Sequence, residues 1–251
     1  MEATKDNQLT DFHYSYLKQD ETGIFQISIA NTLPALREKI APLRFRMAAK
    51  DIAKELNLQP QEKVLEVGSG LGLLGKQIKD IVGSELAYYG IELAFNPASK
   101  SKKNEITPIQ ADAVLLPFGP DSFDAVITTD VLEHIPDVQE AIAEIYRVLK
   151  PDGRVFVVIA DPSEGRFSKV ESHINRTESD SDVKFWEEIF LKKGFKLLGK
   201  ESKKYRNRDW RRIFNLPFLV RLKDKPGFAC AFNPVNRPGT YILRKPLDNV
   251  V

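Results

Sequence analysis

The stretch that decides the fold is VLEVGSGLGLLG, from Val64 to Gly75. Its first four residues are mostly apolar, as in a buried parallel strand, and an amphipathic segment, Leu73–Val82, follows the glycines. A strand, a glycine-rich turn and a helix together form a ligand cradle, because glycine adopts positive φ and lets a ligand approach the backbone closely. The first N–H groups of the helix then remain available to an anion. The alternating glycines are Gly68, Gly70 and Gly72.

Beyond Lys63, short apolar runs alternate with helical stretches, which is the pattern of repeated βαβ units and a parallel sheet. A helix over Leu43–Leu58 is expected before this core, with Asp137 capping a later helix that Pro151–Gly153 ends with a turn. The expected strands are 63–67, 87–91, 106–109, 124–128 and 154–159, and the expected later helices are 72–82, 137–149 and 182–193.

The C-terminal part has a different character. After an apolar run at Phe195–Leu198, residues 201–238 alternate basic clusters with apolar and Pro/Gly-rich stretches. A last short strand, Thr240–Leu243, then follows. We interpret 201–238 as a long insertion between two final strands, of which the second returns antiparallel at the sheet edge.

Composition sets broad limits on the function. With 251 residues, of which 42% are hydrophobic and 29% charged, the chain fits one folded domain with additions. Its 37 basic residues are balanced by 35 acidic ones, so the overall charge does not indicate nucleic-acid binding. The single cysteine, Cys230, fits a reducing compartment. The polar N-terminus and the lack of an apolar run of the ~20 residues that span a membrane predict a cytoplasmic protein.

The glycine turn has two interpretations. Gly70–Gly75 satisfies GxGxxG, the dinucleotide fingerprint, which expects an acidic residue ~20 positions later. Glu92 stands 20 residues after Gly72, so an NAD-dependent oxidoreductase remains open. Glu66, however, precedes the first glycine by two residues. A carboxylate at the mouth of the cradle suits a cationic ligand better than a pyrophosphate.

With VLEVGSGLG, the chain resembles motif I, (V/I)L(E/D)xGxGxG, of the class I S-adenosyl-L-methionine-dependent methyltransferases, in particular the small-molecule type. Four further segments extend the resemblance over about residues 60–160. The resemblance implies a Rossmann-like α/β fold: a doubly wound, mostly parallel sheet of seven strands with an antiparallel last strand and helices on both faces. The four segments are YGIEL (89–93), ADAVLLPF (111–118), FDAVITTDVLEHIPD (123–137) and RVLKPDGRVFVVI (147–159).

The resemblance also implies a cofactor site. Glu92 would accept hydrogen bonds from both ribose hydroxyls and Leu93 would pack on the adenine, while Asp112 would accept from the adenine amino group. The alternatives are that Glu92 and Asp112 are solvated strand ends and that Asp130 only begins a helix. The predicted site residues for S-adenosyl-L-methionine are Glu66, Gly68, Ser69, Gly70, Gly72, Glu92, Leu93, Asp112, Ala113, Thr129 and Asp130.

A hydroxyl acceptor would need a general base, for which histidine is suited because its pKa lies near neutral pH. Of three histidines, His134 follows the fourth strand and His173 follows the fifth, both at the carboxyl ends of strands, where such sheets bind ligands. These two are the candidate catalytic residues, with a packing role as the alternative for His134. No spacing of histidines and cysteines predicts a metal site.

The acceptor is less defined than the cofactor. We divide the chain into an N-terminal cap (1–58), a cofactor-binding core (59–200) and an insertion with a final strand (201–251), and the outer two segments would shape the acceptor pocket. The balanced charge favours a small molecule, one with an apolar part being allowed, over protein or nucleic acid. A peripheral membrane contact by the insertion, a catalytically idle binding protein and any oligomeric state remain open. The aromatic residues of the cap are Phe12, Tyr14 and Tyr16.

Overall fold

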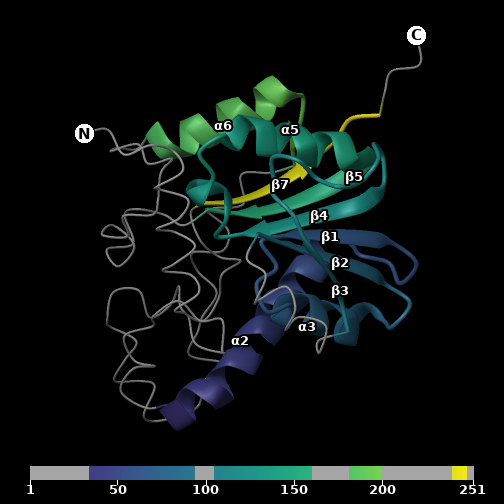
Figure 1. The fold of residues 1–251 in the computed structure, drawn as a ribbon, viewed down its shortest axis with the longest axis vertical. Helices are drawn as coiled ribbons and strands as arrows, with labels where there is room; N and C mark the ends of the chain where they lie inside the picture. The colour runs from purple at the N-terminus through teal and green to yellow at the C-terminus, as the bar shows by residue number, and fades with distance from the viewer. Residues whose placement is uncertain (1–33, 94–104, 160–180, 199–238, 248–251) are drawn as a thin grey trace.

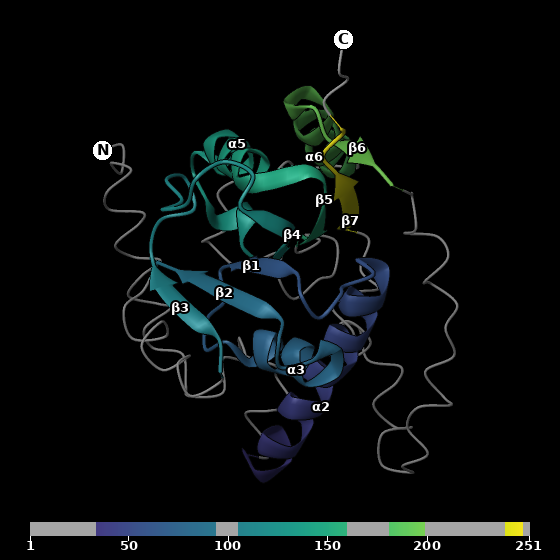
Figure 2. The same cartoon turned by 90° about the vertical axis from the view of Figure 1, so that its right-hand side faces the viewer.

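The computed structural model describes residues 34–93, 105–159, 181–198 and 239–247. These residues build one seven-stranded sheet with the strand order β3-β2-β1-β4-β5-β7-β6 (Figure 2). Strands β1 to β5 run parallel, and β7 is antiparallel to both of its neighbours. The strands are β1 Lys63–Val67, β2 Ala87–Glu92, β3 Thr107–Gln110, β4 Phe123–Thr129, β5 Leu149–Val158, β6 Lys196–Leu197 and β7 Thr240–Arg244.

Helices cover both faces of the sheet. In Figure 1, α5 (Val138–Val148) and α6 (Ser181–Lys193) lie on one face, and α2 (Pro34–Glu55) and α3 (Leu73–Val82) lie on the other. Each face has its own apolar core, because the side chains of a strand point alternately to the two sides. Leu65 and Val67 pack under α5, while Val64 packs with α2 and α3. The predicted α/β fold class, with helices on both faces, is confirmed.

Helix α2 differs from its predicted bounds, Leu43–Leu58. It begins nine residues earlier, at Pro34, and continues through Pro42, although proline disfavours a helix interior. It ends earlier because Asn57 takes a left-handed conformation with φ 48°. The Leu58 N–H then donates to the Ala53 carbonyl at 2.9 Å, which is the hydrogen bond of a Schellman motif.

The predicted turn at Pro151–Gly153 lies inside a strand. Helix α5 ends at Val148 and β5 begins at the next residue, and the pairing with β4 then skips from Leu149 to Arg154. The residues between them form a bulge, with Asp152 at φ 65°. Lys245, just after β7, fixes the bulge through two backbone hydrogen bonds of 3.0 Å. Asp137 is the N-cap residue of α5, as predicted, although its side chain makes no capping hydrogen bond.

The last strand is antiparallel, as expected, but it is not at the edge of the sheet. Strand β7 lies between β5 and β6, and the short strand β6 forms the edge. The register pairs Val158 with Thr240 on one side and Leu197 with Leu243 on the other. Periodicity predicted both strands, but it carries no information on which of them pairs with β5.

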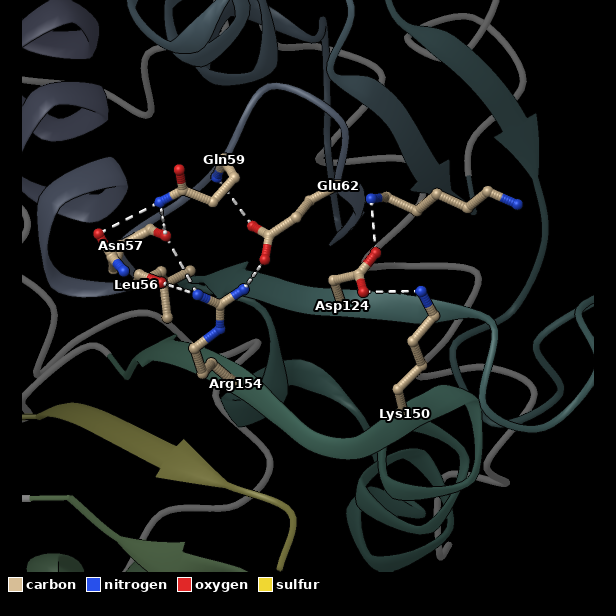
Figure 3. Close-up of polar contacts among 8 residues, drawn as sticks. Leu56, Asn57, Gln59, Glu62, Asp124, Lys150 and Arg154 are labelled. Carbon is tan, nitrogen blue, oxygen red and sulfur yellow. Dashed lines mark hydrogen bonds and ion pairs between the residues drawn. The ribbon is translucent and has the colours of Figure 1, made fainter. Parts of the chain in front are cut away.

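At the edge where the parallel strands begin, which we call the amino edge, a polar cluster ties the layers together (Figure 3). Arg154 of β5 donates to the carbonyl of Leu56, beyond the end of α2, and forms an ion pair with Glu62. Asp124 of β4 accepts from the Lys63 backbone N–H at 2.8 Å and from Lys150 Nζ at 2.7 Å. These groups lie away from the carboxyl edge, where the parallel strands end. None of the described helices is both long and apolar enough to cross a membrane.

Candidate functional site

The glycine turn, residues 68–72, connects β1 to α3 in the conformation that its sequence predicts. Gly68, Gly70 and Gly72 have φ values of 76°, 52° and 73°, a region that residues with a Cβ rarely adopt. Space is limited as well, because a Cβ at position 68 would lie 2.2 Å from Cγ2 of Val131. The turn after β4 therefore packs directly against the glycine turn.

Hydrogen bonds fasten the glycine turn to the end of β2. The backbone N–H groups of Gly68 and Ser69 both donate to the carbonyl of Ile91, each at 2.9 Å. The N–H of Gly70 donates to Oε2 of Glu92, also at 2.9 Å. The Glu92 side chain is buried, and its carboxylate lies beside the backbone of the glycine turn.

Glu66 does not lie at the mouth of the cradle as an exposed anion, and this corrects the expectation from sequence. Its side chain is only 3% exposed, on the face of β1 that α3 covers, and Oε2 accepts a hydrogen bond of 3.0 Å from the hydroxyl of Tyr88. Burial, with a smaller contribution from the nearby Glu92, raises the pKa of Glu66 to about 8 against the opposing effect of the hydrogen bond from Tyr88. The carboxyl group is therefore mainly protonated at neutral pH.

The ring of Tyr88 lies between the sheet and α3, close to Gly75 of the helix. A Cβ at Gly75 would lie 2.5 Å from Cε1 of Tyr88, so the glycine allows this close approach of helix and strand. The glycine at position 75 could be recognised as the last glycine of GxGxxG, but nothing in the sequence indicated that Tyr88 would bind Glu66. Only the register of β1 against β2, which pairs Glu66 with Gly90, brings the two side chains together.

The loop after β3 brings Asp112 and Ala113 to the same edge. The N–H of Ala111 donates to the carbonyl of Glu92 at 3.2 Å, which places the start of the loop beside the end of β2. Oδ1 of Asp112 accepts from the N–H of Val114 at 3.1 Å, and the Ala113 side chain is buried. Leu93, which follows β2, is half-buried, and its carbonyl accepts a hydrogen bond from the Gln110 side chain.

The end of β4 completes the arrangement. Thr129 is the last residue of this strand, and Asp130 follows with φ 55°, while its N–H donates to the carbonyl of Val158 at 2.9 Å. Positive φ costs free energy for a residue with a side chain, and such strain is frequent at functional sites. A single 3₁₀ turn, Leu132–His134, comes next, and His134 is half-buried. The strand ends thus bring the predicted cofactor residues and His134 to one edge.

Three hydroxyl groups at this edge are buried and have no hydrogen-bond partner among the described residues. They are Ser69 Oγ after β1, Thr128 Oγ1 near the end of β4 and Thr240 Oγ1 beside the end of β5. A buried hydroxyl without a partner costs about 1–3 kcal/mol. Thr128 and Thr240 were not singled out from the sequence, because a threonine in a strand is ordinary.

Other predictions fall on residues outside those described. His173, the aromatic residues of the cap (Phe12, Tyr14 and Tyr16) and the insertion at 201–238 belong to this group. The domain boundaries also stay predictions, although Ala48, Ile52 and Leu56 of the predicted cap pack in the same core as α3. Among the described residues, no group of three or more potential ligands is arranged to hold a metal ion.

The core of the chain is similar to known methyltransferases, the proteins whose motifs its sequence resembles. Residues 65–157 match a family model described as "Methyltransferase domain". Sterol methyltransferase-like 3 of Botryococcus braunii is 33% identical over 162 residues, which cover 58% of this chain and 41% of that protein. Demethylmenaquinone methyltransferase of Thermus thermophilus is 32% identical over 137 residues, which cover 52% of this chain and 60% of that protein. The chain therefore spans 41% to 60% of the length of these relatives.

The fold is shared with solved structures at lower sequence identity. One chain comes from the complex between the Haloferax volcanii Trm112 methyltransferase activator and a methyltransferase. It matches with a TM-score of 0.63 and 16% identity, covering 91% of this chain and 99% of that chain. At this identity the match shows a common fold and carries nothing about substrate.

Proposed function

Because this chain belongs to the class I S-adenosylmethionine-dependent methyltransferases, we propose that it transfers a methyl group from S-adenosylmethionine to a small-molecule acceptor. The observation that carries the proposal is the contact between Glu92 and the glycine turn. A buried carboxylate, 6% exposed and 2.9 Å from the Gly70 N–H, lies at the end of β2. There it can accept hydrogen bonds from a ribose diol while the turn leaves the backbone open to the ligand.

The residues present fit this cofactor in two further respects. No described residue donates a hydrogen bond to Oδ2 of Asp112, which suits an acceptor for the adenine amino group. Ser69 Oγ is buried without a partner in the described part of the chain, next to the backbone of the glycine turn. Gly90 makes room for it, since a Cβ there would lie 2.5 Å from this oxygen. A polar ligand at the turn would satisfy the hydroxyl.

In the reaction, the protein would hold the cofactor and the acceptor in the orientation that methyl transfer requires. The cofactor supplies a methyl group activated by its sulfonium centre. Glu92 and Asp112 would fix the adenosine part, and Thr129 and Asp130, at the end of β4, would lie near the methionine part. Such orientation lowers the barrier of an in-line displacement because the reacting groups are held at contact distance.

We propose His134 as the general base if the acceptor is a hydroxyl group. It follows β4 at the carboxyl edge, within four residues of Asp130. An His134→Ala variant should then lose turnover while its affinity for the cofactor stays unchanged. Turnover at the wild-type rate would instead leave His134 with a packing role in the 3₁₀ turn.

For the acceptor, we propose a small molecule with a substantial apolar part. This proposal draws on the names of two relatives, a sterol methyltransferase-like protein and a demethylmenaquinone methyltransferase. Both names refer to extended apolar molecules. The balanced charge of the chain agrees with an uncharged acceptor better than with nucleic acid.

The proposal is tested first by calorimetric titration with S-adenosylhomocysteine and, in parallel, with NAD. We expect micromolar binding of S-adenosylhomocysteine by the wild type and loss of binding in Glu92→Ala. The matched control is Glu140→Ala, since Glu140 is an exposed carboxylate on α5. Binding of NAD without S-adenosylhomocysteine would refute the proposal and restore the oxidoreductase interpretation of GxGxxG.

A further inference from the structure

A pair of charged residues on α5 holds the loop that contains Asp112. Oε2 of Glu144 accepts a hydrogen bond of 2.8 Å from the Leu116 N–H. Arg147 donates to the carbonyl of Phe118 at 2.7 Å and to the carbonyl of Leu116 at 3.1 Å. Three backbone groups of one short loop segment are thereby bound by two side chains from a neighbouring element.

The two side chains also bind each other. Arg147 Nε lies 2.6 Å from Glu144 Oε1, and Nη2 lies 2.7 Å from Oε2, so the contact is bidentate. The guanidinium group lowers the pKa of the Glu144 carboxyl group, which remains charged at neutral pH. Such a planar pair has little freedom, because each group restricts the rotamers of the other. We call it the Glu144–Arg147 clamp.

The clamp holds the end of the loop at Leu116 and Phe118. Further contacts hold the Phe118 ring and the start of the loop. The ring of Phe118 packs edge-to-face against Phe123 at 4.7 Å and against Tyr89 at 6.0 Å between centroids. At the other end, the Ala111 N–H donates to the backbone carbonyl of Glu92. Asp112 thus lies in the chain between the residue bonded to the end of β2 and the clamped part of the loop.

We propose that Glu144 and Arg147 are positioning residues for the cofactor: by holding Leu116 and Phe118, they set the place of Asp112 and Ala113 against the adenine. The inference rests on the proposed function, since it assigns the loop to S-adenosylmethionine. Neither residue touches the predicted cofactor residues directly in the contacts described. Their effect is therefore on affinity, exerted through the backbone of the loop.

Position 147 requires arginine for the planar geometry of its guanidinium group as well as for its charge. Lysine has one donor centre and cannot bind two carbonyls and a carboxylate in a plane. We therefore expect Arg147→Lys to behave much as Arg147→Ala. Glu144→Gln keeps an acceptor for the Leu116 N–H and should have a smaller effect.

The experiment measures S-adenosylhomocysteine affinity by calorimetry for the wild type and these three variants. Arg147→Ala and Arg147→Lys should weaken binding by about 10-fold to 100-fold, because a displaced loop no longer holds its binding groups in the required geometry. The control is Lys150→Ala, which removes an ion pair of 2.7 Å to Asp124 at the amino edge. Urea unfolding shows how far each variant is destabilised.

A merely structural role would lower the stability of the Arg147 variants and leave affinity within twofold of the wild type, as in the Lys150→Ala control. That result would overturn the inference while the proposed function stood. Absence of binding by the wild type would instead refute the proposed function. Hydrogen exchange of the Leu116 amide without ligand tests the clamp itself: exchange should be faster in Arg147→Ala, and an unchanged rate would show that the clamp does not hold the loop.

Discussion

Glu66 illustrates how a residue can be assigned to the right strand from sequence and still be given the wrong surroundings and the wrong charge. Its position in the motif predicted a carboxylate at the mouth of the cradle, but the side chain is buried. Its protonation depends on burial under α3, which outweighs the opposing effect of the hydrogen bond from the Tyr88 hydroxyl, 22 residues away in the chain. By contrast, the positive φ of Gly68, Gly70 and Gly72 was predictable, because this backbone conformation is itself what selects glycine.

The pKa of Glu66 predicts a pH-dependent stability. The pKa is about 8 in the folded state against an ordinary value of 4.5, so the folded state binds the proton more tightly. The resulting contribution to the free energy of unfolding is complete at a pH below the ordinary value. It falls as the pH rises toward 8, by up to about 1.4 kcal/mol per pH unit.

Glutamine cannot ionise and resembles the protonated carboxyl group in shape. Glu66→Gln should therefore gain stability relative to the wild type as the pH rises from about 5 to about 8. Urea unfolding at several pH values measures the difference. Glu140→Gln, an exposed position on α5, serves as the control. Equal pH profiles for Glu66→Gln and the wild type would contradict the assignment of a raised pKa.

At the scale of the element, Arg154 of β5 fastens the C-terminal end of α2 to the sheet, in addition to the apolar packing of the helix. Arg154 donates to the carbonyls of Leu56 and Asn57, which follow the last turn of the helix, and pairs with Glu62 before β1. A cation at the C-terminal end of a helix also compensates the helix dipole. One side chain from β5 thus holds a helix end and the start of β1.

Arg154→Ala should lower the free energy of unfolding by about 3 kcal/mol, because Glu62 would lose its charged partner and two carbonyls their donor. Equilibrium unfolding in urea measures the loss, and Arg154→Lys should recover part of it. Affinity for S-adenosylhomocysteine should not change, because the cluster lies at the amino edge. A loss below about 0.5 kcal/mol would show that water replaces these contacts, as at an exposed ion pair.

Elements whose sequence has a strong local periodicity were predictable, but features that depend on contacts between distant parts of the chain were not. Strand β1 was predicted with its observed bounds, and α3 within one residue, since strand and helix periodicity are both local properties. The start of α2 at Pro34 was missed because the apolar periodicity that predicted the helix was followed only from Leu43. The bulge at the start of β5 was missed because Lys245, which fixes it, is about 90 residues distant in sequence.

For the whole molecule, the meeting of the site residues at one edge could be predicted from the parallel direction of the strands. Parallel strands end on the same side, so the turns after β1, β2, β3 and β4 must lie together. The roles of Tyr88 and of the Glu144–Arg147 clamp could not be predicted, because each depends on a contact between elements. Sequence pattern gives the direction of a strand, but it does not give the neighbour of each side chain.

A ligand at this edge should stabilise the entire fold. S-adenosylhomocysteine at about 100 times its dissociation constant adds about 2.7 kcal/mol to the free energy of unfolding. For a protein of this size, that shift raises the melting temperature by roughly 5–10 °C. Differential scanning fluorimetry measures the shift, with NAD at the same concentration as the control. A larger shift with NAD would contradict the proposed function.

The place of β7 determines when the sheet can be completed on the ribosome. Strand β6 leaves the ribosome before its partner exists, since Thr240 follows Leu197 by about 40 residues, or roughly 2–8 s of translation. During this interval, β5 of the nascent chain has one edge without a partner, and such an edge is where another chain can add. Only after Arg244 has emerged can β7 close that edge and give β6 a place in the sheet. The half of the sheet that carries the glycine turn has no such delay, because β1 to β4 are complete long before.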